Sequence, residues 1–191
     1  MRATTATTEA ETNLLTPCPH IALIGFSGAG KSTVGQVVAP RLGRRCVDTD
    51  AAIEAACGKS VSQIFAEEGE SFFRAREHEE LMAALDTRPA AVIACGGGMV
   101  VAPENFNALK ERAVVVYLRV EPAFALARID ELHSRPLLAE AGTNDVIAAL
   151  MASRTALYEA LADVSVTTDY RGVDEVCDTL IDRIRKAGYE L

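Results

Sequence analysis

The sequence has no tryptophan, only four lysines and no apolar run approaching the length of a membrane span. A transmembrane helix needs about 20 consecutive apolar residues, so we expect no membrane partner. Basic residues are also in the minority, because 19 Lys and Arg face 27 Asp and Glu and give a formal net charge of −8. Nucleic-acid binding requires a basic face that neutralises phosphates, so we expect no nucleic-acid partner.

The cysteines lack the close spacing of a zinc site or a disulfide framework. They are scattered along the chain, at Cys18, Cys46, Cys57, Cys95 and Cys177. Reduced thiols in a cytoplasmic protein explain this pattern best.

The N-terminal segment is rich in threonine and includes Glu9 and Glu11. It has neither the basic start and apolar stretch of a secretory signal nor the acid-poor composition of a transit peptide. We therefore expect a disordered tail over residues 1–19 and a single domain over residues 20–191, a typical domain size. No separate apolar stripe suggests self-association, so we expect a monomer.

Short apolar segments alternate with helical patterns through this domain. The pattern predicts buried strands at 21–24, 45–47, 90–94, 113–118 and 164–167. Helical spacing predicts helices at 31–42, 50–57, 60–68, 70–85, 103–111, 121–130, 144–162 and 172–187. Such alternation indicates an α/β fold with three layers, in which helices cover both faces of a five-stranded parallel sheet. The charged stretch 131–143 has no regular pattern and fits a mobile lid.

A glycine-rich motif, GFSGAGKS, lies between the first predicted strand and the first predicted helix, at residues 25–32. It matches the GxxxxGK[ST] phosphate loop. Glycines let backbone N–H groups converge on phosphate oxygens, and the helix N-terminus adds a positive partial charge. Lys31 would reach the β- and γ-phosphates, and the Ser32 hydroxyl would bind Mg²⁺. The motif predicts nucleotide binding but does not identify the acceptor.

Asp48 and Asp50 directly follow the second predicted strand. Residues two apart in an extended segment face the same side, so both carboxylates can point into one cleft. One could serve the Mg²⁺ shell and the other could accept a proton from an attacking hydroxyl. Taken by itself, Asp50 is better explained as a helix N-cap, because it directly precedes the helical pattern of Ala51–Ala56.

Each of the other candidate site residues can be explained either by a functional role or by an ordinary structural one. Arg74 and Glu77, at i and i+3, could be a solvated helix pair. Three consecutive glycines, 96–98, follow a buried strand and suggest close approach of a ligand. Arg135 lies in the irregular stretch and could stabilise charge from a lid, whereas Arg154 could be surface charge.

Together these motifs resemble the shikimate kinase family from about Ile21 to the final helix. The shared sequence runs GFSGAGKST, DTD, FFRAREHE, GGG and RPLL, and then Arg154 shortly before Leu157 and Tyr158. The resemblance implies a P-loop kinase fold with a lid. It also implies transfer of the γ-phosphoryl of ATP to the 3-hydroxyl of shikimate, giving shikimate 3-phosphate and ADP in the aromatic amino acid (chorismate) pathway.

The resemblance implies roles for the acceptor side of the site. Asp50 would bind the reacting hydroxyl and act as general base. Arg74, Arg154 and the backbone of Gly97 and Gly98 would hold shikimate, with the arginines binding its carboxylate.

It also implies roles on the nucleotide side. Lys31 and Arg135 would be catalytic, the latter closing onto the phosphates with the lid, while Arg128 and Arg171 would lie near the adenine. Ser32 would bind Mg²⁺ directly and Asp48 through water. The phosphate loop residues expected to hold ATP are Gly28, Ala29, Gly30, Lys31, Ser32 and Thr33.

Three alternatives stay open at this point. Another small-molecule kinase, such as a gluconate kinase, would share the phosphate loop but need not share the later motifs. A nucleoside monophosphate kinase would need a pocket for a second base, which nothing in the sequence suggests. A catalytically silent binding module would normally have lost Lys31, Asp50 or a substrate arginine, and all of these are present.

Overall fold

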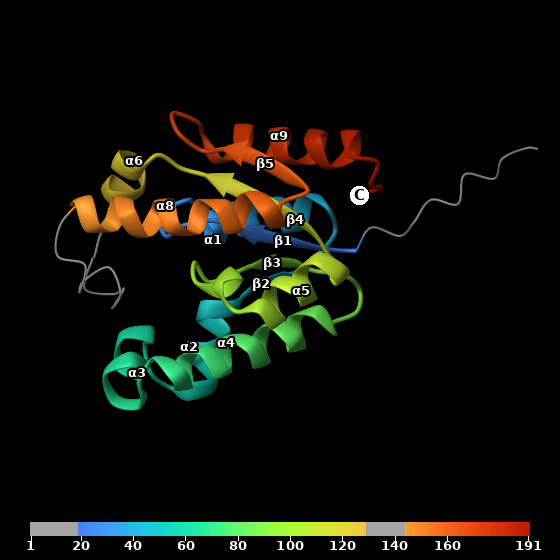
Figure 1. Cartoon of the computed structure of the whole chain (residues 1–191). Helices are drawn as coiled ribbons and strands as arrows, with labels where there is room; N and C mark the ends of the chain where they lie inside the picture. The colour runs from blue at the N-terminus through green and yellow to red at the C-terminus, as the bar shows by residue number, and fades with distance from the viewer. Residues whose placement is uncertain (1–18, 129–143) are drawn as a thin grey trace, which may run out of the picture.

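The computed structural model describes residues 19–128 and 144–191, which form a parallel α/β sandwich (Figure 1). In this described part a five-stranded sheet has the order β2-β3-β1-β4-β5, with every pair parallel. The strands are β1 (His20–Ile24), β2 (Cys46–Asp48), β3 (Val92–Ala94), β4 (Ala113–Arg119) and β5 (Val164–Thr167). The helices are α1 (Lys31–Arg41), α2 (Thr49–Cys57), α3 (Val61–Glu68), α4 (Glu70–Leu85), the 3₁₀ helix η1 (Met99–Val101), α5 (Pro103–Arg112), α6 (Pro122–Arg128), α8 (Asn144–Leu161) and α9 (Val173–Lys186).

The alternating sequence pattern therefore predicted the fold class correctly, and all five strands are confirmed within two residues at their ends. The expected lid at 131–143 and, apart from Pro19, the expected tail at 1–19 lie outside the described residues. None of the helices described here combines the length and the hydropathy that crossing a bilayer would require.

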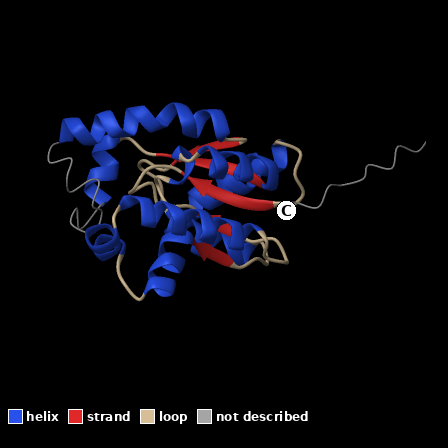
Figure 2. Cartoon of the chain, turned by 60° about the horizontal axis from the view of Figure 1, so that its bottom comes forward, coloured by secondary structure: helices blue, strands red, loops and turns tan. Residues whose placement is uncertain are grey.

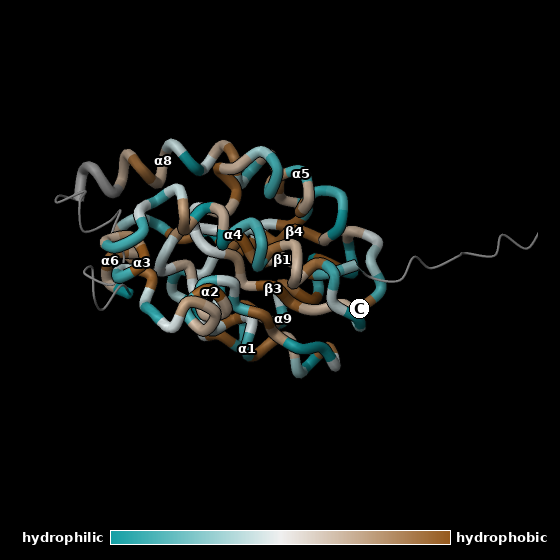
Figure 3. The backbone as a smooth tube through the Cα atoms, turned by 90° about the horizontal axis from the view of Figure 1, so that it is seen from below, coloured by the Kyte–Doolittle hydropathy of each residue, from teal (hydrophilic) through white to brown (hydrophobic). Residues whose placement is uncertain are grey.

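Side chains along β1, β3 and β4 alternate between two apolar layers, which is why these strands are largely apolar. Helices cover the faces of the sheet (Figure 2), and hydrophobic residues concentrate along these strands (Figure 3). Ile21 and Leu23 pack with α1 and α9 on one face. Ala22 and Ile24 pack with α4, α5 and α8 on the other. The sheet is thereby held rigidly between two helical layers.

A smaller apolar cluster joins α2, α3 and α4 beyond the edge of the sheet, at the bottom of Figure 1. It consists of Ile53, Val61, Ile64 and Phe73, with Phe65 and Phe72 packed around them. The start of α3 is fixed by a capping box between Ser60 and Gln63. This cluster determines where α4 presents its side chains to the sheet edge.

The carboxyl ends of three strands are level at that edge. Asp48 of β2 pairs with Ala94 of β3, and Ala94 pairs with Leu23 of β1. The loops after β1, β2 and β3 consequently leave the sheet side by side, where ligands bind in open α/β sheets.

At the opposite end of β1, His20 is a buried titratable group with a 4 % exposed surface. Its Nδ1 accepts a hydrogen bond from the Ala91 N–H at 3.1 Å. Burial, together with the positive charges of Arg88, Arg112 and Arg44, lowers the pKa of His20 below its ordinary value of 6.5.

We expect His20 to make the protein less stable as the pH falls below about 6.5. In that range His20 binds a proton in the unfolded chain but stays neutral in the folded chain, so the free energy of unfolding falls by up to about 1.4 kcal/mol per pH unit as the pH decreases. The substitution His20→Asn keeps an acceptor but removes the titration. Urea unfolding between pH 5.5 and 8 should show a flatter pH dependence for the variant, and equal slopes would contradict this assignment.

Candidate active site

The phosphate loop joins β1 to α1 in a conformation that only glycine adopts easily at three positions. Gly25, Gly28 and Gly30 have φ values of +144°, +81° and +86°. Gly28 also packs against α6, because a Cβ there would lie 2.5 Å from the Ala125 carbonyl oxygen. The Lys31 ammonium folds back over the loop and donates to the Phe26 carbonyl at 2.9 Å.

The N-terminus of α1 opens toward this loop, and its cap, Gly30, supplies no side-chain hydrogen bond. Backbone N–H groups at an uncapped helix start are suited to bind an anion. They border a pocket of about 320 Å³ that collects residues from all three strand ends. Its lining is Ser27, Gly28, Gly30, Lys31, Ser32, Thr33, Asp48, Asp50, Cys95, Gly97 and Arg128.

Asp48 and Asp50 both line the pocket, as the sequence predicted, but the local geometry differs from that prediction. The helix begins at Thr49, so Asp48, not Asp50, is its N-cap and accepts the Ala51 N–H at 3.1 Å. The other Asp48 oxygen accepts the Ser32 hydroxyl at 2.5 Å. Asp50 lies in the first helical turn, with its carboxylate directed at the loop after β3.

Thr49, between the two aspartates, fastens the β2 loop to β3. Its buried hydroxyl donates to the Ala94 carbonyl at 3.3 Å and accepts the Gly96 N–H at 2.9 Å. No role was assigned to Thr49 from the sequence, although its place between the two candidate carboxylates of the DTD motif could have drawn attention to it.

Asp50 and Glu77 converge on the first glycine of the triple-glycine loop. A Cβ on Gly96 would lie 2.6 Å from Asp50 Oδ1 and 2.7 Å from Glu77 Oε1. Glu77 is only 1 % exposed, so the reading of Arg74 and Glu77 as a solvated pair is wrong. Burial raises the pKa of Glu77, while the neighbouring Arg74 guanidinium opposes the shift.

Arg74 is held in place from its own helix. It hydrogen bonds Glu77, and its Nη2 lies 3.0 Å from Glu70 Oε1. Its guanidinium also lies against Gly98, where no Cβ could fit beside it without moving it. The glycine therefore allows the arginine to approach the backbone.

Arg154 reaches the same loop from α8, so it is more than a surface charge. Its Nη1 donates to the Gly97 carbonyl at 3.3 Å, and its guanidinium carbon lies 6.0 Å from the centre of the Phe26 ring. Arg74, Arg154, Asp50 and the glycine loop thus form one cluster beside the phosphate loop.

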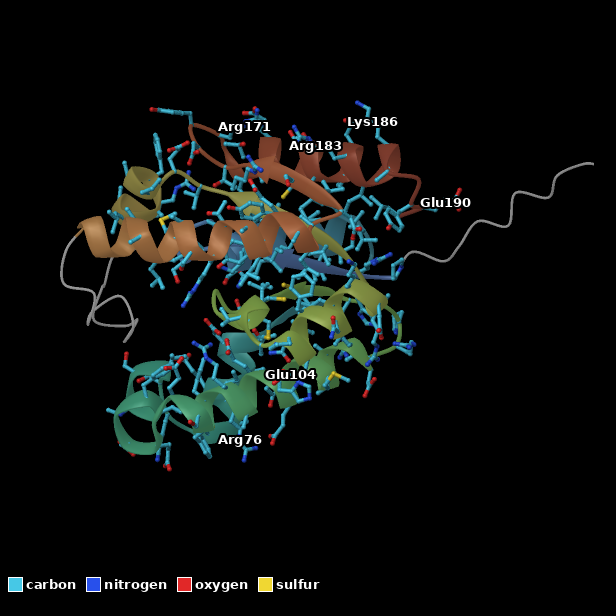
Figure 4. The ribbon with its side chains drawn as sticks, viewed as in Figure 1. Arg76, Glu104, Arg171, Arg183, Lys186 and Glu190 are labelled. Atoms are coloured by element: carbon cyan, nitrogen blue, oxygen red, sulfur yellow. The ribbon has the colours of Figure 1, made fainter. Side chains whose placement is uncertain are left out.

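The remaining predicted arginines differ in position. Arg128 lines the pocket, and its guanidinium donates to the Thr168 hydroxyl at 3.0 Å and to the Thr168 carbonyl at 2.7 Å. Arg171 lies near the start of α9 at the top of Figure 4, where it pairs with Glu175. Arg135 lies outside the described residues.

A phosphate loop at the central strand with carboxylates and arginines converging beside it is the arrangement of P-loop kinases that phosphorylate small molecules. The family model described as shikimate kinase matches residues 27–185. The chain belongs to the shikimate kinase family, and it is an ATP-dependent phosphotransferase.

Relatives and solved structures agree with this membership. A shikimate kinase of Chromohalobacter salexigens is 42 % identical over 170 residues, covering 88 % of this chain and 93 % of that protein. The structure of shikimate kinase from Acinetobacter baumannii in complex with shikimate has a TM-score of 0.85 and 34 % identity, covering 91 % and 96 % of the two chains. A gluconokinase from Sinorhizobium meliloti, at 15 % identity and a TM-score of 0.54 over 91 % and 95 %, shares the fold alone.

The close approach at Gly96 gives a testable consequence. In Gly96→Ala the new Cβ would displace the Asp50 and Glu77 carboxylates, so we expect kcat/KM for phosphorylation of shikimate to fall at least about 100-fold, with a loss of about 1–3 kcal/mol in stability. Gly97→Ala is the matched control, because its Cβ would meet its nearest neighbour, the Ser27 backbone, at 3.5 Å. Steady-state kinetics and urea unfolding of both variants measure this, and equal losses would contradict it.

Proposed function

We propose that this protein transfers the γ-phosphoryl group of ATP to the 3-hydroxyl of shikimate, in the aromatic amino acid pathway. The observation that supports this most is the meeting of the phosphate loop with Asp50, Arg74 and Arg154 at one sheet edge. Phosphoryl transfer depends chiefly on positioning and on neutralising charge. A single pocket edge that carries both a phosphate site and an acceptor site meets that requirement.

On the nucleotide side, residues 28–33 hold the phosphates of ATP through their backbone N–H groups and the Lys31 ammonium. The open start of α1 and the pocket beside it support this assignment. Arg128 flanks the adenine, supported by its place in the pocket lining, and Arg171 is assigned there by the resemblance alone. Arg135 stabilises charge on the transferred phosphoryl group.

The donors beside the phosphate loop suit Mg²⁺. Ser32 and Asp48 offer a hydroxyl and a carboxylate whose oxygens are 2.5 Å apart, and hard divalent cations prefer such oxygen ligands. Ser32 binds the ion directly, and Asp48 holds one of its water ligands. When bound, Mg²⁺ neutralises charge on the β- and γ-phosphates.

On the acceptor side, the arginines bind the carboxylate of shikimate through charge-assisted hydrogen bonds, helped by backbone N–H groups of Gly97 and Gly98. Asp50 accepts the proton of the 3-hydroxyl as that oxygen attacks phosphorus. Its position at the border of the nucleotide pocket, close to the glycine loop, supports this role.

We also propose that the protein acts as a cytoplasmic monomer. The described cysteines, Cys46, Cys57, Cys95 and Cys177, are free thiols. In the described part of the chain the large apolar side chains recorded as exposed are Val101 and Tyr170, which supports a monomer.

Release of ADP by the purified protein tests the proposed function directly. With ATP and Mg²⁺, we expect turnover with shikimate, none above background with gluconate or without an acceptor, and loss of turnover when Mg²⁺ is chelated. Turnover with gluconate alone would keep the phosphate loop assignment and overturn the acceptor assignment. ATP binding without turnover on either acceptor would favour a binding module.

The role of Asp50 predicts a split between chemistry and nucleotide binding. In Asp50→Asn we expect kcat to fall about 10²–10⁴-fold, because general-base catalysis contributes that much, while ATP affinity changes less than about twofold. Glu54→Gln, one helical turn further, is a control that keeps an acceptor for the Val61 N–H. Calorimetric ATP binding and initial rates distinguish the effects, and unchanged kcat in Asp50→Asn would exclude the general-base role.

A further inference from the structure

Tyr158 of α8 contacts the triple-glycine loop, residues 96–98, through its hydroxyl. Its hydroxyl donates to the Gly97 carbonyl at 2.6 Å, and the whole residue is buried, with 1 % of its surface exposed. Arg154, four residues earlier on the same helix face, donates to the same oxygen at the longer distance of 3.3 Å. Two donors therefore converge on one carbonyl.

The ring of Tyr158 is fixed by its surroundings. It stacks on Tyr117 of β4, with ring centres 5.1 Å apart and planes 26° from parallel. Burial raises the pKa of the Tyr158 hydroxyl above its ordinary value, so the proton needed for donation stays on the oxygen. Stacking and burial therefore hold the hydroxyl where it donates to the Gly97 carbonyl.

The held carbonyl determines the direction of the next N–H group. The peptide that joins Gly97 to Gly98 is planar and trans, so the Gly98 N–H points opposite to the Gly97 carbonyl. Tyr158 holds the carbonyl toward α8, whereas Gly98 borders Arg74 of α4. These helices lie on either side of the loop in Figure 1, so the Gly98 N–H points away from α8, on the side of Arg74.

We propose that Tyr158 is a positioning residue for the acceptor: its hydroxyl fixes the Gly97–Gly98 peptide so that the Gly98 N–H faces the bound shikimate. This rests on the proposed function. Tyr158 is the shorter of the two donors to this carbonyl. Arg154 can therefore turn to the shikimate carboxylate while the Tyr158 hydroxyl keeps the peptide oriented, whereas without that hydroxyl the carbonyl would depend on the guanidinium that the substrate needs.

The test compares Tyr158→Phe with Tyr117→Phe, which removes a hydroxyl from the other ring of the stack. The Tyr117 hydroxyl interacts with Thr155, on the same helix as Tyr158. We expect the KM for shikimate to rise about tenfold in Tyr158→Phe, the effect of losing one hydrogen bond to a partly buried acceptor, with the KM for ATP within about twofold of wild type. Tyr117→Phe should keep both constants near wild type.

Each result separates this proposal from its alternatives. Equal KM values for shikimate in the two variants would overturn it, and so would parallel losses for shikimate and ATP, which indicate a merely structural role. Wild-type protein without shikimate turnover would contradict the proposed function instead. In ¹⁵N-labelled protein, shikimate should shift the Gly98 amide resonance in wild type and much less in Tyr158→Phe. An equal shift would overturn the proposal independently of the kinetics.

Discussion

The parallel direction of β1, β2 and β3 is the constraint on which the active site depends. Residues 25–33, 48–50 and 96–98 are far apart in the sequence, yet they leave the sheet at one edge because Leu23, Ala94 and Asp48 are in register. Reversing any of these strands would move its loop to the opposite edge. The phosphate site, the carboxylates and the glycine loop are therefore combined by topology, and side-chain bonds such as that of Thr49 to Gly96 refine their positions.

Charge is distributed unevenly around this edge. The chain carries a formal net charge of −8, but Lys31, Arg74, Arg128 and Arg154 face the site. Asp48 and Asp50 line the same pocket. Glu77 is buried beside Arg74 with a raised pKa, and it holds Arg74 together with Glu70. An arginine fixed in this way loses little side-chain entropy on binding an anion, so these four cations suit anionic substrates in spite of the acidic chain.

Sequence reasoning was most successful where one physical requirement governs a contiguous segment. A buried strand followed by glycines and a helix can be read from residues 21–42, and the parallel sheet follows from the alternation of strands with helices. The strand order β2-β3-β1-β4-β5 came only from the structure. It was weaker for contacts between segments. The prediction that Asp48 and Asp50 both reach the pocket was correct, but its premise of an extended segment was not. The helix begins at Thr49, one residue earlier than predicted, and Asp48 caps it. The sequence was compatible with a solvated position for Glu77, because helical spacing does not show that this face of α4 packs on the loop after β3.

The triple glycine shows why such contacts are hard to foresee. A run of glycines indicates that other groups approach the backbone closely, but it does not say which groups. The neighbours are carboxylates at Gly96, the phosphate loop backbone at Gly97 and the Arg74 guanidinium at Gly98. The carbonyl of the middle residue also receives donors from α8, about sixty residues later in the chain. The loop thus lies between the phosphate loop and the proposed acceptor site. Its orientation depends on a tyrosine and an arginine whose spacing alone would fit any amphipathic helix.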